Sequence, residues 1–285
     1  MKLSVIGLGP GDEAMMTAEA LDAIEASDCI VGYGVYIDLI RHLIGGKEIL
    51  TTPMKQEAAR CRMAVEAAAS GKNVAMVSSG DAGIYGMAGL VYEVLSEYPD
   101  TQVEVKVIPG ITAASSAAAV LGAPLTTDFA VISLSDLLTP WEDIEKRLRL
   151  AAEAGFVMAI YNPASKKRAD YLKKACRIVS EYLPPETPCG YVRNIGREGQ
   201  ESAVLTLKEL SEFPADMFTT VIIGNRTTKV IGGKLVTPRG YRGVGEGEYW
   251  KLGRSFPNPV VRGSRGGCSH PSVLNFILDR KAAKI

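Results

Sequence analysis

Short runs of apolar residues alternate along the chain with longer segments in which apolar residues recur at helical spacing. Up to residue 121, the runs that predict strands are 3–6, 29–32, 73–78 and 103–108. The segments that predict helices are 14–26, 57–69, 86–98 and 113–121. Unbroken apolar runs of this length are typical of strands that are buried on both faces. The alternation predicts a mostly parallel sheet covered by helices.

A second pattern of the same kind follows residues 122–127, whose glycine and proline predict a hinge. The strands predicted there are 129–134, 156–161, 189–193, 219–224 and 234–237. The predicted helices are 141–153 and 169–182. We therefore expect an α/β fold with two α/β domains, at residues 1–122 and 128–240. Residues 241–285 form a tail rich in Gly, Arg and Ser, for which we expect at most partial order.

Glycine-bearing turns follow three of the predicted strands, at residues 7–11, 80–86 and 109–112. In sheets of this class, ligands bind beyond the carboxyl ends of the strands. Because all three turns belong to that edge, we expect them to converge on one ligand site.

The turn at residues 7–12 (GLGPGD) does not make a dinucleotide-binding fingerprint. Asp12 replaces the third glycine of that motif, and Pro10 lacks the N–H that such a loop donates to phosphate. No acidic residue for a ribose ends the predicted strand 29–32. The chain has no G-x-x-x-x-G-K-[ST] segment, which excludes a P-loop. It has two histidines, so we expect neither a His-based metal cluster nor a Ser-His-Asp triad.

Asp81, in the turn at 80–86, indicates what kind of ligand this edge would bind. A carboxylate there suits a sugar hydroxyl or a cation rather than a phosphate, and S-adenosylmethionine offers a ribose, an amino acid and a sulfonium. The alternative is an Asx-turn, in which Asp81 bonds its own backbone. The first interpretation predicts that Asp81→Ala weakens the binding of S-adenosylhomocysteine while the fold stays intact.

Composition adds few constraints. The 32 basic and 32 acidic residues give a formal net charge of +0, which gives no reason to expect nucleic acid or an anionic membrane as a partner. No apolar stretch approaches the roughly 18 residues needed to cross a bilayer. The five cysteines are scattered without a C-x-x-C pair, which favours reduced thiols and a cytoplasmic location.

Three segments in order resemble the tetrapyrrole (corrin/porphyrin) methylase family: residues 5–12 (VIGLGPGD), 79–86 (SGDAGIYG) and 107–113 (VIPGITA). Four others resemble the members of that family that methylate C17: residues 31–36 (VGYGVY), 133–141 (SLSDLLTPW), 161–165 (YNPAS) and 219–225 (TTVIIGN). The resemblance covers about residues 1–241.

The resemblance implies two α/β domains of the class III methyltransferase type, with a deep cleft between them and usually a homodimer. It implies transfer of a methyl group from S-adenosylmethionine to C17 of a tetrapyrrole substrate, precorrin-3B or cobalt-precorrin-3, which leaves S-adenosylhomocysteine. It also implies contraction of the ring to precorrin-4 or its cobalt form, in cobalamin biosynthesis. The residues it assigns to the cofactor are Pro10, Ser79, Gly80, Asp81, Ile84, Thr112, Ala113, Asn162, Gly190 and Tyr191.

Ring contraction involves proton transfers, so an acid or base is expected near the substrate. The candidate catalytic residues are Tyr33, Tyr36, Ser135, Asp136 and Thr139. The substrate carries many carboxylates, which basic side chains at the cleft mouth would bind. The candidates are Lys55, Arg60, Lys166, Lys167, Arg193 and Arg197, each with the alternative of a solvated surface charge.

Two other functions remain open at this point. The chain could methylate another position of the corrinoid or a protein side chain, or it could carry cofactor and tetrapyrrole without turnover. The segments at 133–141 and 161–163 favour the C17 reaction over the first of these.

Overall fold

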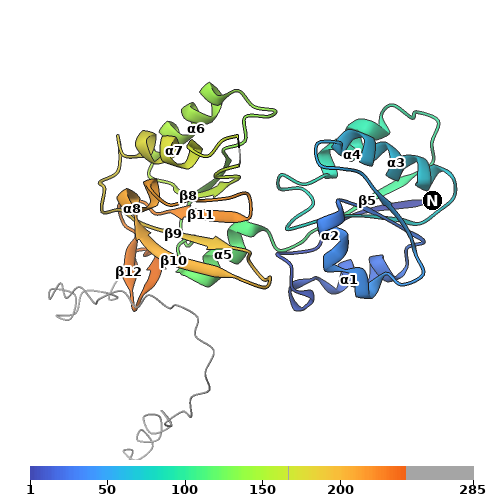
Figure 1. The fold of residues 1–285 in the computed structure, drawn as a ribbon, viewed down its shortest axis with the longest axis horizontal. Helices are drawn as coiled ribbons and strands as arrows, with labels where there is room; N and C mark the ends of the chain where they lie inside the picture. The colour runs from blue at the N-terminus through green and yellow to red at the C-terminus, as the bar shows by residue number, and fades with distance from the viewer. Residues whose placement is uncertain (166, 242–285) are drawn as a thin grey trace, which may run out of the picture. The chain divides into compact units, whose positions relative to one another are not determined.

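The structure is a computed structural model that describes residues 1–165 and 167–241 (Figure 1). Lys166 and residues 242–285 of the predicted tail lie outside the described residues. The first sheet contains five parallel strands in the order β3-β2-β4-β1-β5. The strands are β1 (Lys2–Gly7), β2 (Cys29–Gly32), β3 (Glu48–Thr51), β4 (Val74–Ser78) and β5 (Glu104–Ile108).

Helices cover both faces of this sheet because its central strands β1, β2 and β4 are buried on both sides. Leu3, Val5 and Met76 pack on one face with residues of α3 (Glu57–Ala69) and α4 (Ala88–Leu95). Residues of alternate register, such as Ile6 and Val77, pack on the other face against α1 (Ala18–Glu25) and α2 (Gly34–Leu39). The expected mostly parallel sheet with helical cover is therefore confirmed.

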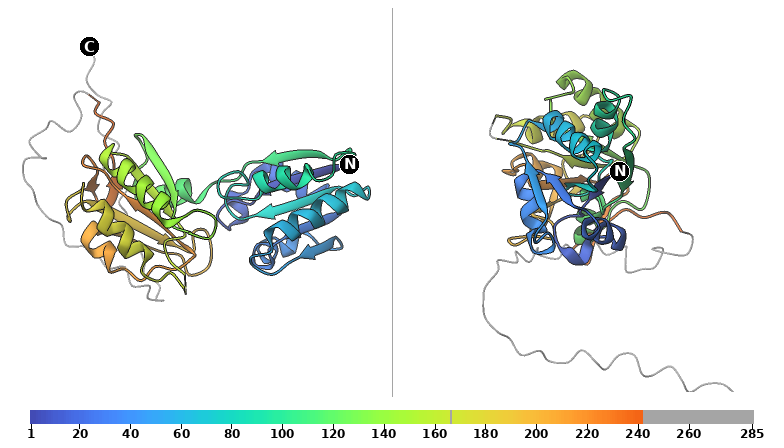
Figure 2. Two further views of the ribbon diagram at one scale, coloured as in Figure 1. Left: turned by 90° about the horizontal axis from the view of Figure 1, so that it is seen from above. Right: turned by 90° about the vertical axis from the view of Figure 1, so that its right-hand side faces the viewer.

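The second sheet is mixed, in the order β10-β9-β11-β8-β7. Its strands are β7 (Phe129–Ser133), β8 (Val157–Tyr161), β9 (Pro188–Arg193), β10 (Glu201–Thr206) and β11 (Thr219–Ile223). Only β7 and β8 run parallel to each other; the other neighbours are antiparallel. Three helices pack on one face: α6 (Trp141–Glu153), α7 (Tyr171–Val179) and α8 (Leu207–Ser211) (Figure 2).

Helix α5 (Ala113–Leu121) covers the opposite face of the second sheet, although it directly follows β5 of the first sheet. Its Ala114, Ala117 and Leu121 are buried with residues of β8, β9 and β11. Just after it, β6 (Gly122–Ala123) pairs with β13 (Lys234–Val236), which also pairs with β12 (Lys229–Ile231). The proposed domain limits of 1–122 and 128–240 stay predictions, and α5 shares its core with the second sheet.

The helix predicted at 14–26 is two helices, because the chain caps twice there. The Asp12 carboxylate accepts from the Ala14 N–H at 2.9 Å and begins a 3₁₀ turn, η1 (Glu13–Met15). The Thr17 hydroxyl accepts from the Ala20 N–H at 3.1 Å and begins α1. The sequence analysis did not predict α2, the 3₁₀ turn η2 (Arg41–Leu43), β3, β10, α8 or the short strands β6 and β12.

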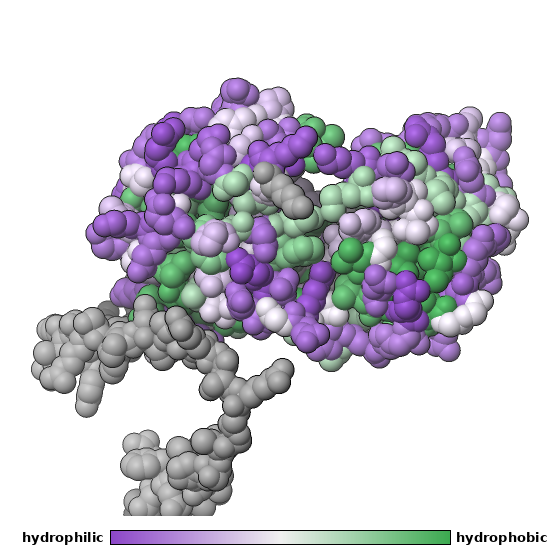
Figure 3. All heavy atoms as spheres, in the orientation of Figure 1, coloured by the Kyte–Doolittle hydropathy of each residue, from purple (hydrophilic) through white to green (hydrophobic). Residues whose placement is uncertain are grey.

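In the surface view of Figure 3, hydrophilic residues dominate much of the outline, and hydrophobic residues gather in patches between them. Within residues 1–165 and 167–241, no helix is both long enough and apolar enough to cross a membrane. Four cysteines in this part of the chain are buried and free, namely Cys29, Cys61, Cys176 and Cys189.

Candidate functional site

The three glycine turns meet at the carboxyl edge of the first sheet, as the sequence predicts. Gly9 and Gly80 exchange two backbone hydrogen bonds of 3.0 and 2.7 Å. A Cβ atom on Gly110 would lie 2.1 Å from the carbonyl oxygen of Gly80. One on Gly7 would lie 2.7 Å from the amide nitrogen of Gly110. These glycines are needed because the three backbones pass closer together than any side chain allows.

The Asp81 carboxylate connects the turn at 80–86 to the turn at 109–112 through hydrogen bonds. Its Oδ1 accepts from the N–H groups of Gly83 and Ile84 at 2.8 and 3.0 Å, which is the Asx-turn alternative. Its Oδ2 accepts from the N–H of Gly110 at 3.0 Å. A carboxylate oxygen accepts two hydrogen bonds, so Oδ2 keeps capacity for a ligand hydroxyl or cation.

The second sheet contributes Tyr161 and Asn162 at the end of β8. The Tyr161 hydroxyl lies 2.6 Å from the Thr112 hydroxyl and accepts from the Ala114 N–H at 2.7 Å. Burial raises the pKa of Tyr161, so its hydroxyl stays protonated near neutral pH. Asn162 has a left-handed backbone (φ 52°) and donates to the Ser133 hydroxyl at 2.9 Å. The start of α5 is thus tied to the end of β8.

Tyr85 extends from the turn at 80–86 to β7, the last strand of the second sheet. Its hydroxyl donates to the Val131 carbonyl and accepts from the Ser133 N–H, both at 3.1 Å. Its ring centroid lies 5.5 Å from that of Tyr161. The glycine turn of the first sheet is therefore held to the second sheet by a side chain.

Arg197 makes a second connection between the two sheets. It follows β9, and its Nε donates to the Pro10 carbonyl at 3.1 Å. Its Nη2 donates to the Ser79 hydroxyl at 2.8 Å. Pro10 lies in the first glycine turn and Ser79 directly precedes the second, so this side chain reaches the point where the turns converge.

A cavity of about 220 Å³ lies among these groups. Its lining includes one candidate catalytic residue, Tyr36, and one candidate carboxylate-binding residue, Arg197. The candidate cofactor residues that line it are Pro10, Ser79, Gly80, Asp81, Ile84, Thr112, Ala113 and Asn162. The lining residues that the sequence analysis missed are Tyr85, Tyr161, Asn194, Ile195, Met217, Phe218, Thr219 and Thr220. Four of these (Tyr85, Tyr161, Thr219 and Thr220) lie inside the segments that resemble the methylase family, which was the available signal.

Gly190 and Tyr191 do not line this cavity. A Cβ atom on Gly190 would lie 2.8 Å from a methyl carbon of Leu121, so the glycine makes room for α5. The Tyr191 ring points to the other face of β9 and stacks on Phe213 with 3.8 Å between centroids.

The other candidate near Tyr36 is Tyr33, whose ring meets that of Tyr36 edge-on with 5.6 Å between centroids. Arg60 is buried beside them, with its guanidinium carbon 5.7 Å from the Tyr33 ring centroid. Arg60 Nη2 donates to the carbonyls of Thr52 and Pro53 at 3.3 and 3.1 Å. Arg60 therefore holds in place the two residues that directly follow β3.

The candidates Ser135, Asp136 and Thr139 lie in the loop between β7 and α6 and do not line the cavity. Arg168 donates to the Ser135 hydroxyl at 2.8 Å and pairs with Asp136 at 3.1 Å. The Tyr171 hydroxyl donates to Asp136 at 2.6 Å, which raises the pKa of Tyr171. The structure brings Ser135 and Asp136 into a network with Arg168 and Tyr171.

The remaining basic candidates also lie away from the cavity lining. Arg193 pairs with Glu201 at 3.1 Å and with Asp216 at 3.2 Å, so its charge is balanced within the fold. Lys55 and Lys167 are exposed. Lys166 lies outside the described residues.

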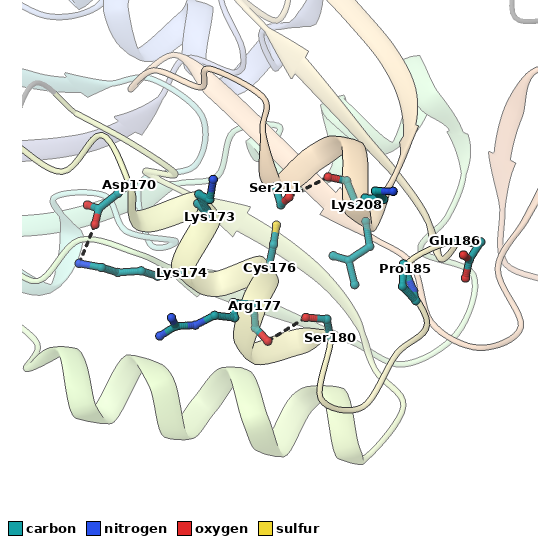
Figure 4. Close-up of a pocket in the computed structure, with 11 residues that line it drawn as sticks. Asp170, Lys173, Lys174, Cys176, Arg177, Ser180, Pro185, Glu186, Lys208 and Ser211 are labelled. Carbon is teal, nitrogen blue, oxygen red and sulfur yellow. Dashed lines mark hydrogen bonds and ion pairs between the residues drawn. The ribbon is translucent and has the colours of Figure 1, made fainter.

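A larger cavity of about 680 Å³ lies between α7 and α8 (Figure 4). Its lining Lys174 pairs with Asp170 at 2.9 Å, and its lining Lys173 pairs with Glu212 at 2.8 Å. Burial raises the pKa of the Cys176 thiol to about 12, so that thiol is a poor nucleophile. None of the motif segments contributes to this cavity, and the smaller one remains the candidate site. In the described part of the chain, no three His, Cys, Asp or Glu side chains are placed to hold a metal ion.

Comparison with known proteins identifies the family. The profile of the tetrapyrrole (corrin/porphyrin) methylases matches residues 2–211. The "Probable cobalt-factor III C(17)-methyltransferase" of Salmonella typhimurium is 50% identical over 84% of this chain and 99% of its own length. The precorrin-3B C(17)-methyltransferase of Sinorhizobium sp is 41% identical over 86% of this chain and 98% of its own.

The fold agrees with this result. The crystal structure of the methyltransferase CobJ superposes with a TM-score of 0.78 at 39% identity, over 83% of this chain and 99% of that one. All three glycine turns, Tyr161 and Arg197 lie inside the matched residues. The chain belongs to the tetrapyrrole (corrin/porphyrin) methylase family.

Proposed function

We propose that the chain transfers the methyl group of S-adenosylmethionine to C17 of a corrin precursor and contracts the ring, as a step of cobalamin biosynthesis. The observation that carries this proposal is the convergence of three glycine turns with Tyr161 and Asn162 on one cavity. Relatives that are named for the C17 reaction match the chain over both sheets.

The chemistry of the cavity fits this cofactor better than a nucleotide phosphate. Its lining offers hydroxyls and carbonyls as hydrogen-bonding groups, one carboxylate at Asp81 and one guanidinium at Arg197, and it includes no lysine. Asp81 retains acceptor capacity for a ribose hydroxyl or a cationic group. S-adenosylmethionine supplies a methyl group on a sulfonium, which a nucleophilic carbon attacks in line.

The chain's own residues would then bind, align and exclude water. The turn from Gly80 to Ile84 and the start of α5 at Thr112 and Ala113 would hold the cofactor. Met217 and Phe218 present apolar surface at the cavity, which favours the exclusion of water from the reacting groups. Alignment of the reacting atoms is the main contribution that such a transfer needs from a protein.

Tyr36 is the candidate proton donor that the geometry favours, because it alone among the five catalytic candidates lines the cavity. Burial raises the pKa of Tyr36, although the nearby Arg197 charge opposes the shift. The hydroxyl is therefore protonated at neutral pH and able to donate to a substrate during contraction.

The degree of identity favours a cobalt-containing substrate. The relative at 50% identity is named for cobalt-factor III, whereas the one at 41% identity is named for precorrin-3B. We therefore propose cobalt-factor III ahead of precorrin-3B. Any cobalt would enter with the substrate.

The direct test incubates the purified chain with methyl-labelled S-adenosylmethionine and either cobalt-factor III or precorrin-3B. We expect label in the corrinoid, with the cobalt form preferred, and NMR of the product should place the methyl at C17. Tyr36→Phe should slow contraction about 100-fold or more, the usual size of an acid–base contribution. Tyr33→Phe, its matched control outside the cavity lining, should change the rate much less.

The alternatives give different results in the same assay. Label at another ring position or on a protein side chain would replace the C17 assignment with another methylase activity. Tight binding of cofactor and tetrapyrrole with no label transferred would indicate a carrier and would overturn the proposed enzyme.

We also propose that the active form is a homodimer in the cytoplasm. Light scattering of the purified chain would measure its oligomeric state, and a monomer at working concentration would contradict the proposed dimer. Cell fractionation would measure the cellular location of the protein, and recovery outside the cytoplasmic fraction would contradict the proposed location.

A further inference from the structure

The loop after β9 presents Arg197 in a fixed position. Asn194 and Gly196 adopt left-handed conformations (φ 52° and 66°), and the Arg197 N–H donates to the Asn194 carbonyl at 3.0 Å. The Gly196 N–H donates to the side chain of Gln200 at 2.8 Å. These bonds fix the backbone of the loop on both sides of Arg197, and the side chain is held by its own bonds to Pro10 and Ser79.

The first glycine turn is shaped to receive this side chain. A Cβ atom on Gly11 would lie 2.6 Å from Cγ and 2.9 Å from Nε of Arg197. Gly11 therefore allows the arginine stem to lie directly on the backbone of the turn. The guanidinium is therefore positioned at the cavity by the loop after β9 and by the backbone of the first glycine turn.

The charge of Arg197 has no counterion within residues 1–165 and 167–241. Its hydrogen-bond acceptors, the Pro10 carbonyl and the Ser79 hydroxyl, are both neutral. Arg193 and Arg168, by contrast, each pair with a carboxylate. A guanidinium has five N–H donors, so those not used by these two bonds remain for a ligand.

The surroundings make this charge costly to leave unpaired. Arg197 is partly buried, and this burial lowers its pKa. Asp81 lines the same cavity but directs its carboxylate to three backbone N–H groups rather than to Arg197. Tyr36 is neutral near pH 7, and burial raises its pKa further. No carboxylate of residues 1–165 and 167–241 is thus paired with Arg197, although Asp81 lines the same cavity.

We propose that Arg197 is the carboxylate-binding residue of this cavity, and that its ligand supplies the missing counterion. This inference rests on the proposed function, which offers two sources of a carboxylate: the amino-acid end of the cofactor and the acidic side chains of the tetrapyrrole. Both suit a guanidinium, which binds carboxylates through two parallel hydrogen bonds.

The test compares ligands that differ only in the carboxylate. Calorimetry would measure binding of S-adenosylhomocysteine and of its decarboxylated analogue to the wild type and to Arg197→Met. If the cofactor supplies the carboxylate, the variant should lose about 10- to 100-fold affinity for the first ligand and little for the second. Because both ligands bind the same variant, a general folding defect cannot produce this difference. Arg197→Lys should recover part of the loss.

If the tetrapyrrole supplies the carboxylate, S-adenosylhomocysteine binding should be unchanged in Arg197→Met. The affinity for a tetrapyrrole polycarboxylate, measured by fluorescence titration, should then fall by the same factor. The matched control is Arg177→Met, which removes an exposed arginine of α7 outside this cavity. It should change neither affinity.

Unchanged binding of both ligand classes by a folded Arg197→Met variant would overturn the proposal. An equal loss for the decarboxylated analogue would also overturn it, since that result indicates a structural role. Failure of the wild type to bind S-adenosylhomocysteine at all would instead contradict the proposed function.

Discussion

The two sheets supply the candidate site in different ways. The first sheet contributes mainly backbone: its three glycine turns pack so closely that a Cβ on Gly7 or Gly110 would collide with the neighbouring main chain. The second sheet contributes side chains, such as Tyr161, Asn162 and Arg197, from the ends of its strands and the residues that follow them. We therefore expect substitutions in the first sheet's turns to damage the fold, and substitutions in the second sheet mainly to alter what the site binds.

The largest expected effect is that of Gly110→Ala. The new methyl group would lie 2.1 Å from the Gly80 carbonyl oxygen and 2.6 Å from the Gly7 carbonyl carbon. Forcing backbone apart in this way should lower the free energy of unfolding by about 3 kcal/mol, measured by urea denaturation. The matched control is Gly89→Ala in α4, which meets nothing within 4 Å and should raise stability by about 0.5–1 kcal/mol. Equal stability of both variants would contradict the role of the backbone contacts.

Asp81→Ala should have the next largest effect on stability, because the Asp81 carboxylate accepts hydrogen bonds from the backbone of two turns. Loss of three hydrogen bonds to a carboxylate should reduce the free energy of unfolding by about 2 kcal/mol. The chain should stay folded, and calorimetry should show about tenfold weaker binding of S-adenosylhomocysteine.

Asp81→Asn separates the two roles of that carboxylate. Its amide oxygen can retain the bonds from Gly83 and Ile84, but its NH₂ group cannot accept from Gly110. We expect an intermediate loss of stability. Binding and stability equal to the wild type in both Asp81 variants would show that the carboxylate has neither role.

Tyr161→Phe should have the smallest effect on the fold. It removes the acceptor of the Ala114 N–H and the partner of Thr112, which should cost about 1 kcal/mol in urea denaturation. Tyr92→Phe, on the exposed side of α4, is the matched control and should change stability by less than about 0.5 kcal/mol. A loss as large as that of Gly110→Ala would remove the proposed distinction between the two sheets.

Most strands and helices could be predicted from the sequence because their apolar patterns are strong. α6 and α5 have the limits that their periodicity predicts. The edge strand β3 was missed because little of it is buried. The edge strand β10 was missed because all of its residues are exposed or half-buried. The start of α8 did carry a readable signal, since Thr206 and Glu209 form a capping box.

The candidate site could be predicted where a single turn carries the information. Ser79, Gly80, Asp81 and Ile84 of one turn line the cavity, as do Thr112 and Ala113 at the start of α5; their role in binding the cofactor stays a prediction. The partners of Arg60 and Asp136 could not be predicted, because they depend on how distant segments pack. The same limit applies to Tyr85 and Tyr161, whose hydroxyls act on strands and helices far away in the sequence.

Tyr85 has a consequence that extends beyond the binding of a ligand. Its hydroxyl satisfies one acceptor and one donor on the outer side of β7, where the second sheet ends. An unpaired strand edge is a template for association with another chain, and the Tyr85 hydroxyl occupies one such pair of backbone groups on β7. Any movement that withdraws the turn to admit a bulky substrate would uncover that edge. The same tyrosine therefore lines the cavity and contacts the exposed edge of β7.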